Sequence, residues 1–377
     1  MINVLKPKFR TEEIIEQMRI CLDKGWTGLG FKTIEFEDGW KDYTSLPYAH
    51  FINSATSGLH LALNVYRNLY GWEDGDEIIT TPLTFVSSNH AIMYERFTPV
   101  FTDVDSSLCL DPEDVLRKIT SKTKAVMFVG LGGNAGQLDR ISKICKERNI
   151  KLILDAAHMA GTFVATGKHV GHEADATIFS FQAVKNLPTS DSGMICFNDE
   201  KCDKLARELS WLGINKDTYS RFNKGSYKWK YDVPNVGFKY HGNALTAAIG
   251  IVQLKYLEQD NERRRTIANL YKKALRDLDG IGIVASSKYT LKNSRHLFQI
   301  IVDTNKRDNI IEALYKQDIY PGVHYIDNTS YTPYKEHAGK CLAASKLSDS
   351  LITLPIHCNL SDDDVSKVVK TIKEFYS

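Results

Sequence analysis

The chain has 377 residues, of which 43% are hydrophobic and 25% are charged, a size and composition that suit one large domain and a smaller one. Its 48 Lys and Arg residues nearly balance 46 Asp and Glu residues, and the net charge of +2 argues against a general attraction to nucleic acid or to an anionic membrane. No window reaches the roughly 18 apolar residues that a spanning helix needs. We therefore expect a cytoplasmic protein that acts on small molecules.

The seven cysteines are scattered singly along the chain. They form no C-x-x-C pair and have no nearby histidine at zinc spacing. This pattern is typical of reduced thiols in a protein without a metal site.

Short β-rich runs alternate with amphipathic helical patterns from about residue 48 to residue 200. The expected strands are "AHFINSA", "DEIITTP", "PVFTDVD", "KAVMFVGL", "IKLILDAA", "ATIFSF" and "GMICF". Helical patterns such as "GLHLALNVYRNLYG" and "LDRISKICKERN" lie between several of them. The alternation predicts an α/β fold with a mostly parallel sheet flanked by helices, in which ligands gather at the carboxyl ends of the strands.

The pattern changes after about residue 245. A long helix pair or one interrupted helix is expected over "NALTAAIGIVQLKYLEQDNERRRTIANLYKKALRDL". The strand candidate "HLFQIIVDT" and the helical runs "RDNIIEALYKQ" and "DDDVSKVVKTIKEFY" follow. We predict a large domain over residues 1–250 and a smaller C-terminal α/β domain over residues 251–377, packed closely because no flexible linker separates them.

The stretch "NSATSGLHLALNVY" leads from an expected strand directly into a helix. Its hydroxyl residues Ser54, Thr56 and Ser57 can cap the free N–H groups of that helix. The same geometry binds phosphate, because the N–H groups and the helix dipole face an anion. A Walker-type nucleotide site is not indicated, since no G-x-x-x-x-G-K-[ST] loop is present.

The stretch "KLILDAAHMAG" ends an apolar strand at Asp155 and adds His158 one turn later. An aspartate at this point can simply cap the next segment, and a single histidine is commonly structural. A carboxylate can instead keep a heteroaromatic nitrogen protonated, so that the ring accepts electrons from a developing carbanion.

The stretch "FSFQAVKNLPTSDSG" places Lys185 between an apolar run and a turn. A lone lysine there fits a solvated loop. If it is partly desolvated, however, its pKa falls and its amine can form a Schiff base with an aldehyde. An amine at Lys185, a phosphate-binding helix start near Thr56 and an acid at Asp155 together predict a site for pyridoxal 5'-phosphate (PLP).

The order of these parts, and the stretches around them, resemble the DegT/StrS-type sugar aminotransferases, which have the fold-type I, aspartate aminotransferase-like architecture. The resemblance covers nearly the whole chain. Its supporting stretches are "GWTGLGFKTIEFEDGW", "NSATSGLHLAL", "TPLTFVSSNHAI", "PVFTDVD", "LDAAHMAG", "FSFQAVKNLPTSDSGMI", "NVGFKYHGNALTAAIGIVQL", "VHYI" and "LPIH".

The resemblance implies a role for each matching residue. Lys185 would carry the cofactor as a Schiff base, Asp155 would bind the pyridine nitrogen, and His158 would lie near the phenolic oxygen of the ring. Phe85, in "TFVSS", would stack on the ring face.

The cofactor phosphate would be held by residues from two stretches and from a second subunit. The residues implied are Thr56, Ser57 and Ser180. Asn243, in "HGNALTAA", would reach across a homodimer interface to the phosphate of the neighbouring subunit.

Two departures from the family pattern involve small residues. Many relatives have a "GEGG"-like turn after the lysine, where this chain has residues 190–193, "SDSG", and they read S-G-T where this chain has Ser54, Ala55 and Thr56. Dehydratase relatives replace the lysine with histidine, so Lys185 argues against that branch.

The expected reaction follows from these roles. L-glutamate would give its amino group to the cofactor, with Lys185 moving the proton, and a keto sugar would accept it in a ping-pong cycle. The acceptor is expected to be a nucleotide-linked keto-deoxysugar used for a surface polysaccharide or a secondary metabolite. Its binding residues are expected to be Arg221, Lys224, Lys228, Lys230, His324 and Tyr325.

Other readings remain open. The four basic residues belong to "YSRFNKGSYKWKYD", residues 219–232, which can be a solvated loop, and His324 and Tyr325 can be structural. The acceptor can also be a ketocyclitol or a sugar without a nucleotide, such as an oxidised octulosonate. The chain can also be a regulator that binds PLP or a sugar nucleotide without turnover, although such a protein is expected to lose the lysine or the aspartate.

Overall fold

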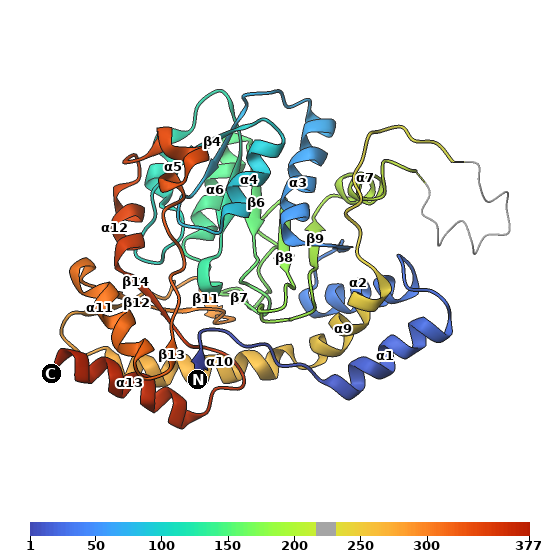
Figure 1. The fold of residues 1–377 in the computed structure, drawn as a ribbon. Coiled ribbons are helices and arrows are strands. Elements are labelled where there is room, and N and C mark those ends of the chain that lie inside the picture. The colour runs from blue at the N-terminus through green and yellow to red at the C-terminus, as the bar shows by residue number, and fades with distance from the viewer. Residues whose placement is uncertain (216–230) are drawn as a thin grey trace.

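The computed structural model of the chain describes residues 1–215 and 231–377. Its centre is a seven-stranded sheet with the order β2-β9-β8-β6-β5-β3-β4, flanked by helices on both faces (Figure 1). Its strands are β2 (His50–Ile52), β3 (Glu77–Thr80), β4 (Thr98–Phe101), β5 (Thr123–Val129), β6 (Lys151–Asp155), β8 (Ala176–Ser180) and β9 (Gly193–Phe197). Each coincides with one of the predicted strands, although β4 and β5 begin one residue before the predicted stretch, so the α/β prediction is confirmed.

The sheet is mostly parallel. Within the described residues, β9 is the one strand of this sheet that runs antiparallel to its neighbours, β2 and β8. The other ladders are parallel. The loop between β8 and β9 is therefore a return at the carboxyl edge of the sheet, where ligands gather.

Both faces of the sheet are buried, which explains why its strands read as continuous apolar runs. Ile79 and Phe128 point into one core, with helices α2, α6 and α9. Ile78 and Met127 point into the other, with α3, α4 and α7. The described helices that precede α10 are α1 (Thr11–Asp23), α2 (Phe31–Thr44), α3 (Ala55–Tyr70), α4 (Val86–Tyr94), α5 (Pro112–Lys118), η1 (Leu131–Gly133), α6 (Leu138–Arg148), α7 (Glu200–Ser210) and α9 (Ala244–Lys255).

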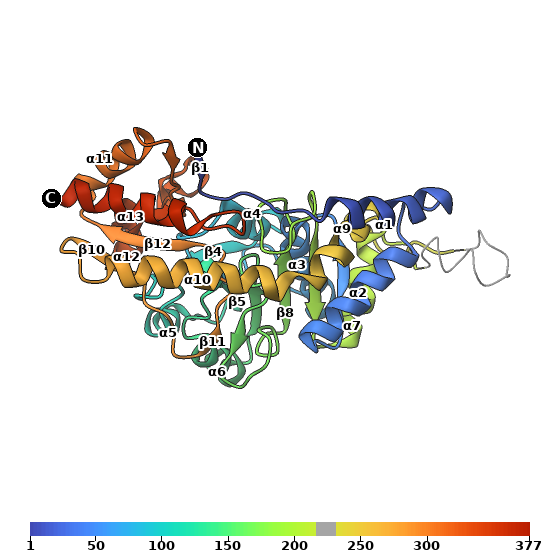
Figure 2. The same ribbon diagram turned by 90° about the horizontal axis from the view of Figure 1, so that it is seen from below.

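The expected helix pair consists of α9 and α10 (Leu257–Leu275), which are separated at Tyr256. Figure 2 shows α10 running along the molecule from α9 to the C-terminal elements. There it packs against α13. The helix thus connects the large sheet with the C-terminal part.

The C-terminal part has its own three-stranded sheet, β10-β12-β14, and its own apolar core. Strand β1 (Ile2–Asn3) pairs with β13, and β7 (Phe163–Val164) pairs with β11. The other elements are β10 (Ile281–Ile283), β11 (Thr290–Lys292), β12 (Phe298–Val302), α11 (Thr304–Tyr315), β13 (Ile319–Tyr320), η2 (Asn328–Ser330), η3 (Thr332–His337), α12 (Leu342–Ser350), β14 (Leu351–Leu354) and α13 (Asp362–Tyr376).

The predicted domain boundary after residue 250 falls inside α9. The first strand of the chain also joins the C-terminal part through β13. The division into residues 1–250 and 251–377 stays a prediction. Among the described residues, no helix is both long and apolar enough to cross a membrane.

Candidate active site

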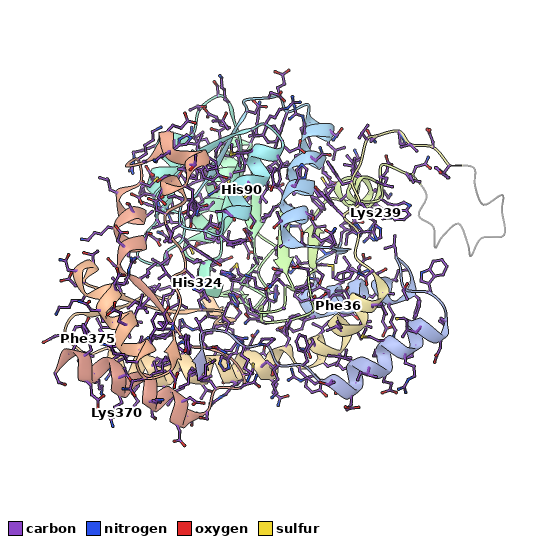
Figure 3. The ribbon with its side chains drawn as sticks, viewed as in Figure 1. Phe36, His90, Lys239, His324, Lys370 and Phe375 are labelled. Carbon is purple, nitrogen blue, oxygen red and sulfur yellow. The ribbon has the colours of Figure 1, made fainter. Side chains whose placement is uncertain are left out.

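A cavity of about 360 Å³ opens at the carboxyl edge of the large sheet. Val129, Asp155 and Ser180, the last residues of β5, β6 and β8, all line it. His324 lines it from the C-terminal part, and Figure 3 shows this residue between the large sheet and the C-terminal elements. The cavity therefore lies where the two parts of the molecule meet.

Lys185 lies in the return loop between β8 and β9 and lines the cavity. The base of the loop is closed by backbone hydrogen bonds from Phe181 N–H to Ser192 O at 2.9 Å and from Thr189 N–H to Phe181 O at 2.8 Å. Next to the lysine, the Asn186 amide donates to Asn261 Oδ1 and to Ser294 O, both at 2.7 Å. The backbone that carries the lysine is thus fixed from both sides.

The environment of Lys185 favours a neutral amine. Burial lowers the pKa of Lys185 to about 8, although the charge of Asp155 acts in the opposite direction. A buried amine with this pKa is partly unprotonated near neutral pH, and only the unprotonated amine attacks an aldehyde.

Asp155 is 4% exposed and is held by two donors. Ser88 Oγ–H donates to Oδ2 at 2.7 Å, and the Ala157 N–H donates to Oδ1 at 3.1 Å. Burial raises the pKa of Asp155, while these hydrogen bonds and the charge of Lys185 oppose that rise. Both donors favour the carboxylate form, which can pair with a protonated ring nitrogen.

His158 is buried and follows Asp155, the last residue of β6, by three residues. Its Nδ1 accepts the Gly132 N–H at 3.2 Å, and its Nε2 lies 3.2 Å from the hydroxyl oxygen of Tyr325. Burial, followed by the charges of Lys185 and His324, lowers the pKa of His158 well below its usual range. The imidazole is therefore neutral at physiological pH.

The N-terminus of α3 forms another wall of the cavity. Ser54 caps the helix by accepting the Ser57 N–H at 3.1 Å, and Ser54, Ala55 and Thr56 line the cavity. The helix start lies so close to β9 that a Cβ on Gly193 would be 2.9 Å from the Ala55 nitrogen. Because first-turn N–H groups have no intrahelical acceptor, this wall suits an anion such as phosphate.

The C-terminal part contributes His324 and Tyr325. The Gln299 amide donates to the His324 carbonyl oxygen, and His324 Nδ1 lies 2.9 Å from Thr353 Oγ1. Burial, followed by the charge of Lys185, lowers the pKa of His324 to about 4. The ring centroid of Tyr325 is 6.0 Å from that of Phe85, so an aromatic wall spans both parts of the molecule.

The structure brings most of the predicted site residues into this one cavity. Those that line it are Thr56, Phe85, Asp155, His158, Ser180, Lys185, His324 and Tyr325. Ser57 does not line the cavity, and its hydroxyl donates to Asn53 Oδ1 at 2.7 Å. Asn243 is exposed at the start of α9 and accepts the Thr246 N–H at 2.9 Å.

Four of the predicted substrate residues lie outside the described residues. They are Arg221, Lys224, Lys228 and Lys230.

Sequence reasoning missed several residues of the site. Ser88 donates a hydrogen bond to Asp155. Asn186 fixes the loop next to Lys185, and the Gly132 N–H binds His158. Asp191 lines the cavity. Ser88 sits in "TFVSSNH" beside the predicted Phe85, so the hydroxyl pair in that stretch was the available signal. The contact of Asn186 with Ser294 spans 108 residues and has no local signal.

The donor set fits PLP. The cavity combines a buried amine of lowered pKa at Lys185, a carboxylate at Asp155 with two donors, and the free end of a helix at Thr56. These groups match an aldehyde, a protonated ring nitrogen and a phosphate. Among the described residues, no group of His, Cys, Asp and Glu is arranged to hold a metal ion.

A family model for the DegT/DnrJ/EryC1/StrS aminotransferase family matches residues 9–373. The chain belongs to this family. It is 34% identical to an uncharacterized protein of Methanocaldococcus jannaschii, over 98% of this chain and 97% of that protein. It is 32% identical to the spore coat polysaccharide biosynthesis protein SpsC of Bacillus subtilis, over 96% of this chain and 94% of SpsC.

Among solved structures, the PMP form of Spr1654 from Streptococcus pneumoniae superposes with a TM-score of 0.92 at 30% identity, covering 100% of this chain and 99% of that one. The same protein has also been solved in a PLP form. The family membership makes this chain a PLP-dependent transaminase of the sugar aminotransferase group. The predicted family, fold and cofactor are confirmed.

Proposed function

We propose that the enzyme transfers the amino group of L-glutamate to a nucleotide-linked keto-deoxysugar in a ping-pong reaction. The observation that carries the proposal is the gathering of Lys185, Asp155 and His158 in one cavity with residues of the C-terminal part. The relative SpsC, a spore coat polysaccharide biosynthesis protein, supports a sugar destined for a polysaccharide.

Bound PLP supplies an electron sink that stabilises negative charge on the carbon of the amino donor. In this chain, Asp155 is held by Ser88 and Ala157, and its carboxylate would pair with the protonated ring nitrogen. Lys185 would hold the cofactor and, as a free amine, would carry a proton to and from the reacting carbon, for which a pKa of about 8 is well suited.

The remaining roles concern orientation. The start of α3, with Thr56, and Ser180 would hold the phosphate, and Phe85 would cover one face of the ring, since all three residues line the cavity. Ser57 supports this wall through its hydrogen bonds to Ser54 and Asn53. His324 and Tyr325 face the sugar from the C-terminal part.

The purified enzyme tests this function directly. The protein in its PLP form should change its absorbance when L-glutamate is added, and the resulting PMP form should return to the PLP form with one of a panel of UDP- and dTDP-linked keto-deoxysugars. Failure with every nucleotide sugar, but turnover with a free keto sugar or ketocyclitol, would replace the acceptor class. The absence of any half-reaction would favour a regulator that binds without turnover.

The proposal includes a homodimer in which Asn243 reaches the phosphate of the neighbouring site. Asn243 is exposed, and it lies outside the cavity of its own chain. Helix α9, which it caps, packs against α1, and α1 exposes Ile15 and Leu22. Exposed apolar side chains on α1, near an exposed site residue, suit a surface that a second copy covers.

Mixed dimers test the role of Asn243. Lys185→Ala and Asn243→Ala subunits are each expected to be inactive, but unfolding and refolding them together should restore activity, because one site of each mixed dimer then has both residues intact. A monomer in analytical ultracentrifugation, or mixed subunits without activity, would contradict the shared site.

A further inference from the structure

A second cavity, of about 810 Å³, opens at the amino edge of the large sheet. Thr123 and Lys151, the first residues of β5 and β6, line it. The same two strands end at Val129 and Asp155 in the active-site cavity. Because a strand rises about 3.3 Å per residue, the length of β5 separates the two cavities by roughly 20 Å. The second cavity is therefore distinct from the site of transamination.

The charged side chains that line the second cavity are all basic. They are Lys124, Arg148 and Lys151, and no Asp or Glu is among the described residues that line it. Lys124 Nζ lies 3.6 Å from a carboxylate oxygen of Asp76. Lys151 Nζ lies 2.9 Å from a carboxylate oxygen of Asp175. Both acids lie outside the lining, so the wall that a ligand would meet is positive.

Arg148 is the cation that the fold leaves without an acidic partner. It is exposed at the last position of α6. It forms no ion pair with any described residue, and the adjacent Glu147 pairs with Lys143. A cation at the carboxyl end of a helix interacts favourably with the helix dipole, but this does not account for Lys124 and Lys151, which stand on strands. The cavity therefore has an excess of positive charge that an anion can neutralise.

Two aromatic side chains, Tyr70 and Trp72, line the same cavity. Their ring centroids are 6.5 Å apart, and their ring planes differ by 33°. Tyr70 is 46% exposed, so its ring is accessible to a ligand. Lys151 Nζ lies 5.0 Å from the centroid of that ring. A flat ring that stacks on Tyr70, as nucleic-acid bases stack on aromatic side chains, would thus lie near a cation.

The size and the remaining lining of the cavity suit one nucleotide. Exposed polar side chains line it at Thr120, Ser121 and Asn149, and hydroxyl and amide groups can bind the hydroxyls of a ribose or the oxygens of a phosphate. The volume is within the range of about 300–1,000 Å³ that is usual for small-molecule sites. The nearly balanced charge of the whole chain gives no general attraction to a nucleic-acid polymer.

We propose that this cavity is a second ligand site, which binds a nucleoside phosphate with its base on Tyr70 and its phosphate on Arg148. Lys124 and Lys151 would add positive charge near the phosphate. A ligand in this cavity takes no part in the transamination, since β5 and β6 separate it from Lys185. The proposal does not depend on which sugar the enzyme aminates.

Isothermal titration calorimetry of the PLP-loaded enzyme with UMP, dTMP, AMP and GMP tests the site. At least one nucleotide should bind, and Arg148→Gln should weaken its binding about tenfold, because the phosphate loses a charged donor. Tyr70→Leu should weaken the binding by a similar factor, because it removes the stacking ring and keeps an apolar side chain.

Lys146→Gln is the matched control for the charge. Lys146 lies in the last turn of α6, as Arg148 does, but it does not line the cavity. Losing this cation should change the affinity by less than about twofold, because salt screens charges that do not contact the ligand.

The same variants separate this site from the active-site cavity, which the nucleotide of the proposed acceptor would also enter. Only the second site should weaken in Arg148→Gln and Tyr70→Leu, and both variants should keep the wild-type rate of the half-reaction with L-glutamate. A panel in which no nucleotide binds, or binding that is equally tight in both variants, would overturn the proposal. The titration uses no acceptor sugar, so its result stands even if the proposed function fails.

Two further ligands test the chemical class. Inorganic phosphate should bind at least about tenfold more weakly than the nucleotide, because it has no ring to stack on Tyr70. A short single-stranded oligonucleotide should bind no more tightly than the mononucleotide. Equal affinity for inorganic phosphate would show a simple anion site, and tighter binding of the oligonucleotide would assign the cavity to nucleic acid. Either result would overturn the assignment to a nucleoside phosphate.

Discussion

Two buried clusters of titratable side chains differ in how their charges are arranged. One is the active-site cluster of Lys185, Asp155 and His158. The other lies between α2, β2 and α7 and consists of Glu37, His50 and Arg207. Asp155 and Glu37, the acids of the two clusters, are both buried, yet burial is accompanied by opposite pKa shifts in them.

In the active-site cluster, burial shifts each group towards its neutral form. It lowers the pKa of Lys185 to about 8, raises the pKa of Asp155 and lowers the pKa of His158. Within the described residues, no ion pair within 4.0 Å joins Lys185 to Asp155. The groups therefore keep the ability to gain or lose a proton.

In the second cluster, direct contacts keep Glu37 and Arg207 charged. Glu37 accepts from Arg207 at 2.9 Å and from the Phe51 N–H at 2.7 Å, and it lies 3.1 Å from His50 Nδ1. Although burial opposes ionisation, the charge of Arg207 and the hydrogen bonds lower the pKa of Glu37 to about 2. Desolvation without close pairing thus prepares a group for chemistry, and desolvation with close pairing holds the fold.

The largest expected effect is the loss of turnover in Lys185→Ala. Positioned proton transfer alone contributes about 10² to 10⁴ in rate, and this change also removes the amine that holds the cofactor. Lys185→Arg should fail equally, because a guanidinium is a poor nucleophile towards an aldehyde. Steady-state kinetics measure the loss, and urea unfolding should show a stability near that of the wild type. A fully active Lys185→Ala would contradict the site.

Glu37→Gln should lower the stability of the protein but leave the kinetics of the folded enzyme normal, the opposite of what is expected for Lys185→Ala. Removing one partner of a buried ion pair costs about 3 kcal/mol, here at the lower end because Arg207 is partly exposed. Because the folded pKa is depressed, this stabilisation is present above the ordinary glutamate pKa and is lost as the pH falls towards 2. Urea unfolding at pH 7 and pH 4 should therefore show a smaller difference between variant and wild type at pH 4.

The pH dependence of PLP uptake should follow Lys185. Only the neutral amine reacts, so the uptake rate of the cofactor-free enzyme should rise about tenfold per pH unit below the pKa and level off above about 8. Stopped-flow absorbance measures this rate. Because the charge of Asp155 raises the pKa of Lys185, Asp155→Asn should move the midpoint to lower pH, and a midpoint near 10 in the wild type would contradict the desolvated lysine.

The smallest expected effect is that of Ser88→Ala. This change removes the hydroxyl that donates to Asp155 at 2.7 Å, so the carboxylate loses a partner and PLP affinity should fall about fivefold. Ser87→Ala is the matched control, because Ser87 lines the same cavity in the same turn of α4. Equilibrium titration with PLP measures both affinities, and equal losses would show that the hydrogen bond to Asp155 is not the cause.

Much of the site could be predicted because the sequence places it at ends of strands and helices. An apolar strand that ends at Asp155 and a hydroxyl-rich start of α3 at Thr56 are local patterns, and parallel strands bring such ends to one edge. Lys185 was identifiable only in combination with them. The hydrogen bond from the Ser57 hydroxyl to Asn53 Oδ1 is a detail that such patterns do not give.

The sequence by itself determined the parallel sheet, the apolar periodicity of its helices and the residues at the carboxyl edge, because these depend on neighbours a few positions apart. Only the tertiary structure decided which distant groups meet, such as Tyr325 with His158 across 167 residues and Ser88 with Asp155 across 67. Such contacts depend on how whole elements pack against one another. The Gly132 N–H, which donates to His158 Nδ1, sets the direction of the hydrogen bond between His158 and Tyr325. No local sequence pattern places Gly132 beside these two side chains.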